Sequence, residues 1–170
     1  MTAFLIITAL ILLNGIFVAA EFAIVGAPRA SIDARAARGN RLAKAVQAVL
    51  RDPQRQDRYI ATAQLGITVA SLGLGMYGEH VLADAIYHSI DRAGAPAWLA
   101  SHGLASVIAI AILTYFHIVV GEMVPKSLAL QQAETMALWI TPPMLWTKTL
   151  VLPLVVGLNE MGNALLRLLG

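Results

Sequence analysis

Three long apolar runs divide the chain, and stretches rich in polar residues separate them. An α-helix rises about 1.5 Å per residue, so about 20 apolar residues cross a hydrocarbon core of about 30 Å. The runs therefore predict three membrane-spanning helices, over about residues 2–26, 59–80 and 98–122. The first begins MTAFLII without Lys or Arg and continues past residue 20, which distinguishes it from a cleaved signal peptide.

The segments outside these runs have a different character. Residues 29–58 combine many charges with apolar positions at helical spacing, which predicts one or two amphipathic helices at the membrane surface, broken at Asp52–Pro53. Residues 79–96 are more polar and predict a membrane exit followed by a loop. Residues 126–170 suit either a belt of short helices along the membrane edge or a fourth span, because prolines interrupt them: Pro142, Pro143 and Pro153.

The composition agrees with a chain dissolved in lipid. Apolar residues make up 58% of the 170 residues and charged residues only 13%, and the mean hydropathy is +0.71. Soluble domains carry about 25% charged residues. We therefore expect an all-α integral membrane protein with membrane lipid as a partner. The chain has no Cys, which excludes disulfides and thiolate metal sites.

The positive charges are concentrated in one place. Eight of the twelve basic residues lie between residues 29 and 58, whereas residues 79–96 contain Arg92 alone. The positive-inside rule therefore predicts that the first of these two segments is cytoplasmic and that the N-terminus is outside. The C-terminus is then cytoplasmic if no fourth crossing follows, in a multi-pass protein of the plasma (inner) membrane. The net charge is only +2, so we expect no nucleic-acid partner despite a pI near 9.2.

Polar residues inside membrane spans are costly and are site candidates by default. The first span contains Asn14 and Glu21 on one face. The other two contribute Gln64, Thr68, Ser71, His117 and Glu122. Thr68 lies ten residues beyond Arg58, or about 15 Å along a helix, which places these faces in the cytoplasmic half of the membrane. Such a cluster of oxygen atoms suits a hard cation such as Mg²⁺.

Each of these residues also has an ordinary structural interpretation. Glu21 could pair with Arg29 or extend to water, and Glu122 could pair with Lys126 four residues later. Thr68 and Ser71 often bond their own helix carbonyls or a neighbouring helix. For Asn14 the alternative is helix–helix bonding, and for His117 it is packing with a hydrogen bond.

Three motifs resemble a known family. They are NGIFVAAEFA at residues 14–23, AQLGITVASLGLG at residues 63–75 and GEMVPKSLAL at residues 121–130. Their order and sequence resemble the transmembrane domain of the CorC/cyclin M (CNNM) Mg²⁺ transporters, whose bacterial members are often labelled hemolysin-like. The resemblance implies three transmembrane helices, short cytoplasmic-side helices and a juxtamembrane helical belt over residues 126–170. It also implies a homodimer and a soluble CBS-pair domain, absent from residues 1–170, through which ATP would bind.

The resemblance implies a function and a ligand set. The function is Mg²⁺ export through an inward-open acidic cavity, with Na⁺ as the candidate coupling ion. The family's ion site uses hydroxyls on the first two helices together with the Glu and the preceding Gly carbonyl of the third-helix motif. The matching positions are Glu122, Gly121, Thr68 and Ser71, with Glu21 and Asn14 as further candidates and with Gln64, His117, Pro125 and Lys126 expected beside them.

One departure and three alternatives accompany this interpretation. Many relatives have serines where this chain has Val18, Ala19 and Ala20, so its first helix offers no hydroxyl there. That leaves the metal selectivity open, and a Co²⁺ or Mn²⁺ exchanger is one alternative. A membrane anchor or sensor for a cytoplasmic regulatory domain is another. The third, an intramembrane hydrolase, lacks a His-Glu-x-x-His or Gly-x-Ser-x-Gly motif, so we expect no enzyme.

Overall fold

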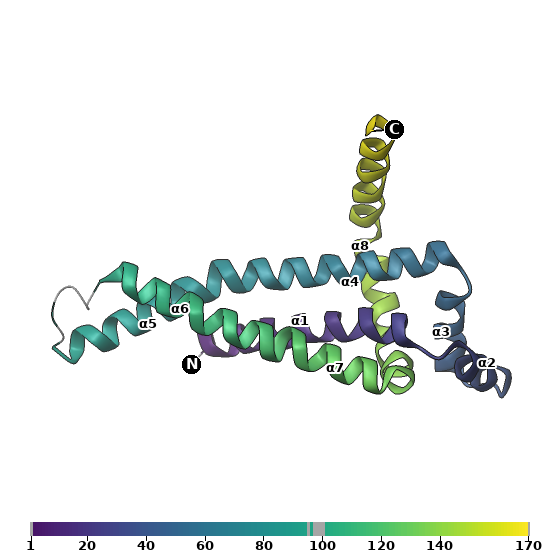
Figure 1. The fold of residues 1–170 in the computed structure, drawn as a ribbon, viewed down its shortest axis with the longest axis horizontal. Helices are drawn as coiled ribbons and strands as arrows, with labels where there is room; N and C mark the ends of the chain where they lie inside the picture. Colours follow the sequence, from purple (N-terminus) through teal and green to yellow (C-terminus); the bar gives the residue numbers. More distant parts are fainter. Residues whose placement is uncertain (1, 95, 97–100, 170) are drawn as a thin grey trace. The chain divides into compact units, whose positions relative to one another are not determined.

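The computed structural model describes residues 2–94, 96 and 101–169 (Figure 1). Within residues 152–169 it describes the backbone throughout but the side chains only in part. The described residues are helical, without strands. The elements are α1 (Thr2–Gly26), α2 (Arg29–Ala37), α3 (Arg41–Leu50), α4 (Pro53–Gly73), the π-helix η1 (Leu74–Gly78), α5 (Glu79–Arg92), α6 (His102–Phe116), the π-helix η2 (His117–Met123), α7 (Val124–Gln131) and α8 (Ala133–Leu169).

Three helical stretches are long and apolar enough to cross a membrane. They are Thr2–Gly26, Pro53–Arg92 and His102–Gln131, with mean hydropathies of 2.5, 1.3 and 2.2 in their most apolar windows. This confirms the predicted class of an all-helical membrane protein with three spans. α8 is not among the candidate spans found in the described residues. The expected start of the third span, at residues 98–100, lies outside the described residues.

Two predicted interruptions are wrong. Residues 79–92, expected to leave the membrane and form a loop, are the helix α5, which follows η1 without a break and packs beside α6 (Figure 1). Pro125, expected to stop the third span, lies inside continuous helix that extends to Gln131. In both places a π-helical segment lies just before the predicted end, and the chain continues through it as a helix.

The chain divides into two compact units. Unit 1 comprises residues 1–15 and 67–125, and unit 2 comprises residues 16–66 and 126–170. The apolar core of unit 1 includes Ile7, Ile11, Leu74 and Leu113. Unit 2 has a larger core rich in Ala and Val, with Tyr59 among its buried side chains.

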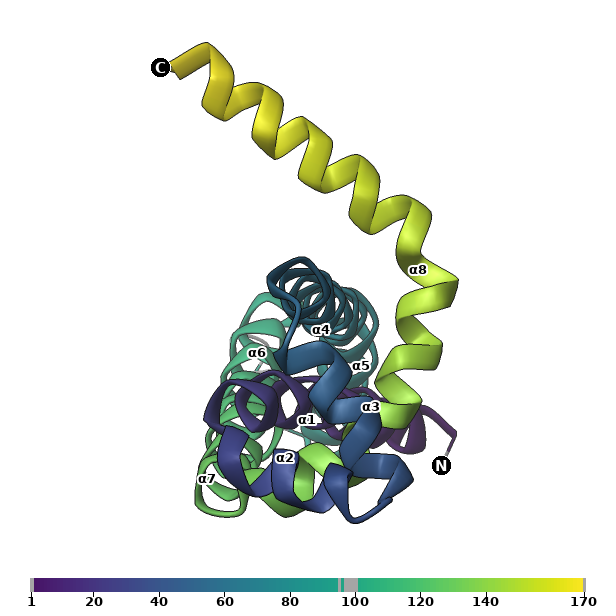
Figure 2. The same cartoon turned by 90° about the vertical axis from the view of Figure 1, so that its right-hand side faces the viewer.

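A helical hairpin is the charged part of unit 2. α2 ends in a turn in which Gly39 has φ +90°, and Asn40 caps α3 by accepting a hydrogen bond from the Ala43 amide at 3.0 Å. α3 packs against α8, and Figure 2 shows α8 bending in its yellow-green part. Pro142 and Pro143 lie inside α8 and lack the amide hydrogens that a straight α-helix uses.

Candidate functional site

A proline in the third span removes one backbone donor just after the π-helix η2. In η2 the Val124 amide donates to the Val119 carbonyl five residues earlier, and Pro125 has no N–H to continue this ladder. Asn14 of α1 supplies a side-chain donor at this point, because its Nδ2 donates to the Gly121 oxygen at 2.8 Å. Gly15 makes this close approach possible, since a Cβ there would lie 2.9 Å from the Pro125 ring.

Ser71 and His117 extend this contact into a network. The Ser71 hydroxyl donates to Asn14 Oδ1 at 3.2 Å, and its oxygen lies 3.2 Å from His117 Nε2. Because the single hydroxyl hydrogen is used on Asn14, we assign the Nε2 hydrogen to His117 as the donor toward Ser71. We call Asn14, Ser71, His117 and the Gly121 carbonyl the polar cluster. It joins α1, α4 and η2 within unit 1.

The polar cluster satisfies groups that are removed from solvent. Asn14 is only 1% exposed, Gly121 is buried, and Ser71 and His117 are half-buried. An unpaired buried amide costs about 1–3 kcal/mol, whereas Asn14 here uses its amide as a donor and its oxygen as an acceptor. The cluster is therefore a well-bonded structural element, as well as a concentration of oxygen atoms in a membrane domain.

The structure brings together four of the predicted site residues: Asn14, Ser71, Gly121 and His117. Thr68 and Glu122 also belong to unit 1, and both side chains are exposed. No described ion pair includes Glu122. Its role as a ligand, like that of Thr68, stays a prediction.

Other predicted residues lie in unit 2. Gln64 Nε2 donates to Glu21 Oε1 at 3.3 Å, which gives the Glu21 carboxylate a neutral partner. The Lys126 ammonium lies 4.5 Å from the centre of the Phe22 ring, a cation–π contact. The three positions without the expected serines, Val18, Ala19 and Ala20, are all buried. Packing therefore accounts for their small apolar side chains.

A cavity beside the polar cluster contains a residue that sequence reasoning missed. Its volume is about 330 Å³, and its lining includes Ser71, Thr114, His117 and the half-buried Glu79. Glu79 lies at the end of the predicted span over residues 59–80, but residues 79–96 were interpreted as a membrane exit, so this carboxylate was not among the candidate site residues.

The side chains available in unit 1 limit which metal ions it could bind. The described residues contain no group of three or more Asp, Glu or His side chains able to hold a metal ion together. A cation held by the described residues would need hydroxyl, amide or carbonyl oxygens in addition to at most two Asp, Glu or His side chains. Such neutral oxygens are ligands of hard cations.

Known proteins provide an independent comparison. Residues 5–170 match the family described as the Cyclin M transmembrane N-terminal domain, CNNM. Two proteins of Bacillus subtilis (strain 168) are similar over 166 residues: UPF0053 protein YhdP is 35% identical and YrkA 37% identical. Each alignment covers 98% of this chain, and 36% of YhdP or 37% of YrkA.

A mycobacterial relative extends the comparison. The uncharacterized protein Rv1841c of Mycobacterium tuberculosis (strain ATCC 25618 / H37Rv) is 35% identical over 170 residues, which are all of this chain and 47% of that protein. The chain thus spans between about a third and a half of the length of these relatives. With its three spans and its match over residues 5–170, the chain belongs to the cyclin M (CNNM) family as a membrane domain.

Proposed function

We propose that this domain binds Mg²⁺ in unit 1 and moves it across the membrane, with export as its direction and Na⁺ as the coupling ion. The observation that carries the proposal is the polar cluster, where hydroxyl, amide and backbone oxygens from three helices converge inside membrane spans. Membership of the family described as a cyclin M transmembrane domain supports it.

The hydrogen bonds of the cluster leave oxygen lone pairs for an ion. The Gly121 carbonyl has two lone pairs, and Asn14 occupies one. Ser71 donates its hydrogen to Asn14 and accepts from His117, which leaves its oxygen one free lone pair. Both oxygens are thereby held in place, and in this proposal the remaining lone pair of each coordinates the ion.

Glu122 supplies the charge in this proposal, and Thr68 supplies a further hydroxyl. Mg²⁺ requires near-octahedral oxygen coordination at about 2.0–2.1 Å and gives up water reluctantly. The exposure of Glu122 suits a carboxylate that meets a hydrated ion and exchanges some of its water. Glu79, in the cavity beside the cluster, would then be a second carboxylate along the path of the ion.

The proposal includes an assembly and a location. The domain would act as a homodimer in the plasma membrane, with the N-terminus outside and the α2–α3 hairpin in the cytoplasm. The relatives are two to three times longer than the part matched here, so they contain further regions. A soluble CBS-pair region that binds ATP is the partner that this proposal includes.

Two other functions each have one supporting observation. The imidazole of His117 favours Co²⁺ exchange, because its Nδ1 keeps a lone pair when Nε2 donates to Ser71 and Co²⁺ accepts nitrogen ligands more readily than Mg²⁺ does. Mn²⁺ exchange is the related alternative, since Mn²⁺ accepts the same oxygen ligands as Mg²⁺. The greater length of the relatives favours a membrane anchor or sensor whose activity lies in another region. Competition among Mg²⁺, Mn²⁺, Co²⁺ and Na⁺ tests the first of these, and flux measurements test the second.

The decisive experiment compares the parent protein with Glu122→Gln in vesicles. We expect Mg²⁺ flux in the parent to respond to a Na⁺ gradient, and Glu122→Gln to weaken Mg²⁺ binding at least about tenfold through the loss of a charged ligand. Asp91→Asn, which removes an exposed carboxylate of α5, is the control and should behave like the parent. Equal Mg²⁺ affinity in Glu122→Gln would exclude this site, and binding without flux would favour the anchor or sensor.

A further inference from the structure

The α2–α3 hairpin of unit 2 contains a polar cavity that plays no part in the proposed ion path. The cavity measures about 670 Å³ and is lined by Ser31, Ala34, Arg35, Arg38, Gly39 and Asn40. Residues 27–28 connect the hairpin to α1, and residues 51–52 connect it to α4. It must therefore stay beside the ends of two membrane-spanning helices, where lipid headgroups lie.

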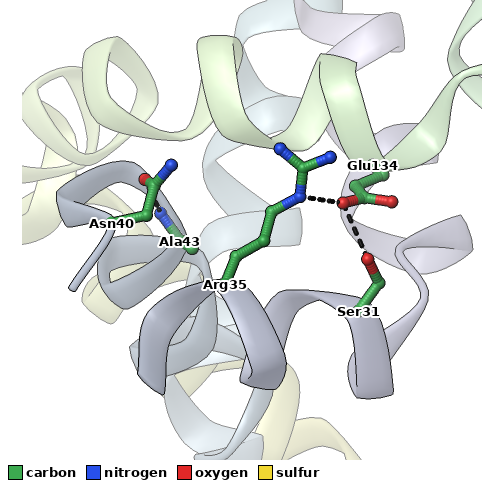
Figure 3. Close-up of polar contacts among 5 residues, drawn as sticks. All are labelled: Ser31, Arg35, Asn40, Ala43 and Glu134. Carbon is green, nitrogen blue, oxygen red and sulfur yellow. Dashed lines mark hydrogen bonds and ion pairs between the residues drawn. The ribbon is translucent and has the colours of Figure 1, made fainter. Parts of the chain in front are cut away.

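The polar side chains of the lining offer hydrogen-bond donors. Asn40 Oδ1 accepts the Ala43 amide hydrogen at 3.0 Å, so its Nδ2 keeps two hydrogens (Figure 3). Arg35 contacts Glu134 of α8 through Nε, and the Ser31 hydroxyl donates to the same carboxylate at 2.7 Å (Figure 3). The two terminal nitrogens of Arg35 lie outside that contact.

The charge of the cavity is positive. Arg35 and Glu134 compensate each other, whereas Arg38 takes part in no ion pair among the described residues. Arg41 and Lys44 follow on α3 and are likewise outside the described ion pairs. A lining with a free guanidinium and a free amide NH₂, and without a carboxylate of its own, favours an anion that has several oxygens.

We propose that this cavity binds a phosphate group, with Arg38, the terminal nitrogens of Arg35 and Asn40 Nδ2 as donors. A guanidinium matches the oxygens of a phosphate with paired N–H groups, which a point charge does not. Two sources have this chemistry: the headgroup of an anionic phospholipid and a soluble phosphate compound. The inference does not depend on the ion that the spans carry.

The test uses the intact protein in nanodiscs of phosphatidylcholine, with and without phosphatidylglycerol. Native mass spectrometry counts retained phosphatidylglycerol, and calorimetry measures binding of inorganic phosphate in neutral nanodiscs. Arg38→Gln removes a charged donor, and Asn40→Asp keeps the helix cap while it replaces both donor hydrogens by a negative charge. Each should weaken binding about tenfold, as expected for the loss of a charge-assisted hydrogen bond.

Arg41→Gln is the matched control, because it removes the same charge from the same hairpin outside the cavity lining. A lipid headgroup is the ligand if the amount of retained phosphatidylglycerol falls with Arg38→Gln and with Asn40→Asp. With Arg41→Gln it should then change less than twofold. Binding of inorganic phosphate with that pattern supports a soluble ligand. If Arg38→Gln and Arg41→Gln weaken binding equally, the protein attracts the anion through its overall charge and the cavity is not the site. If neither probe binds, the proposal is also wrong.

Discussion

The polar contacts between helices in unit 1 and those between α2 and α8 in unit 2 use different chemistry. The polar cluster of unit 1 links three spanning helices through neutral groups, with Asn14 almost fully buried. The contact of Ser31, Arg35 and Glu134 in unit 2 links α2 to α8 through opposite charges (Figure 3). Neutral hydrogen bonds cost little desolvation, so they suit membrane spans, whereas ion pairs suit surfaces that reach water.

This difference has consequences that salt can reveal. A neutral network in a span has no net charge for dissolved ions to screen, whereas an ion pair at the surface weakens as ionic strength rises. The substitutions below therefore separate the two regions by the size of their effects and by their response to salt.

The largest effect is expected for Asn14→Leu. The change leaves the Gly121 carbonyl without its side-chain donor and Ser71 without its acceptor, at a cost of about 1–3 kcal/mol in the free energy of unfolding. Thermal unfolding in detergent measures the loss, which should be the same at low and high NaCl. Thr8→Val, an exposed change on α1, is the control. A salt-dependent loss, or none, would contradict the description of the cluster.

A smaller effect is expected for Gly15→Ala. The added Cβ would lie 2.9 Å from Pro125 Cγ and push α1 away from the third span, which costs about 1–3 kcal/mol as overpacking. Ala has a higher helix propensity than Gly, which offsets about 0.5–1 kcal/mol of this cost. The net loss in the free energy of unfolding should therefore lie near the lower end of the range. Gly75→Ala, where a Cβ meets no atom within 4 Å, should be neutral or stabilising. Equal unfolding temperatures for the two variants would refute the close approach.

A third, weaker effect is expected for Glu134→Gln in unit 2. The side chains of Arg35 and Glu134 are 49% and 25% exposed, so the pair is a surface ion pair worth about 0.2–1 kcal/mol. The loss should be measurable at low NaCl and vanish at high NaCl, unlike that of Asn14→Leu. Asp57→Asn, a carboxylate outside the described ion pairs, is the control. A salt-independent loss would show that the contact acts through packing.

The sequence predicts the spans well because a charge-free stretch of membrane length has few alternatives. It also identifies Asn14 and His117, since polar groups inside a span are costly and must find partners. Their partners could not be predicted. The pairing of Asn14 with the Gly121 carbonyl depends on a π-helical turn and on a glycine beside a proline, which only the packed helices reveal.

The helix ends were predicted less well than the helices. The rule that polar residues or a proline mark the end of a span was wrong after residue 78 and at Pro125, where the helix continues. Inside a membrane the rule weakens, because backbone without hydrogen bonds costs several kcal/mol and the chain continues as a helix where a neighbour can satisfy a freed carbonyl. A second carboxylate near the polar cluster was missed for the same reason.

The smallest effect concerns Asp33, a charged residue of the hairpin. Gln47 Nε2 donates to its Oδ1 at 2.6 Å and Arg51 Nη2 lies 3.2 Å from the same oxygen. The Gln47 hydrogen bond, with help from Arg51, holds the pKa of Asp33 below its ordinary value of 3.8. Its contribution to stability is therefore complete above pH 3.8 and is lost as the pH falls through the lowered pKa.

Asp33→Asn should remove the pH dependence of stability that comes from this carboxylate. The comparison then separates the charged hairpin from the neutral polar cluster, which contains no carboxylate. In thermal unfolding between pH 6 and about pH 3, the parent should lose slightly more stability than the variant, because only the parent has this carboxylate to protonate. Asn14→Leu should run parallel to the parent over the same range, since the group it removes does not titrate. If Asp33→Asn instead follows the parent at every pH, the contact with Gln47 contributes no charge-dependent stability to the hairpin.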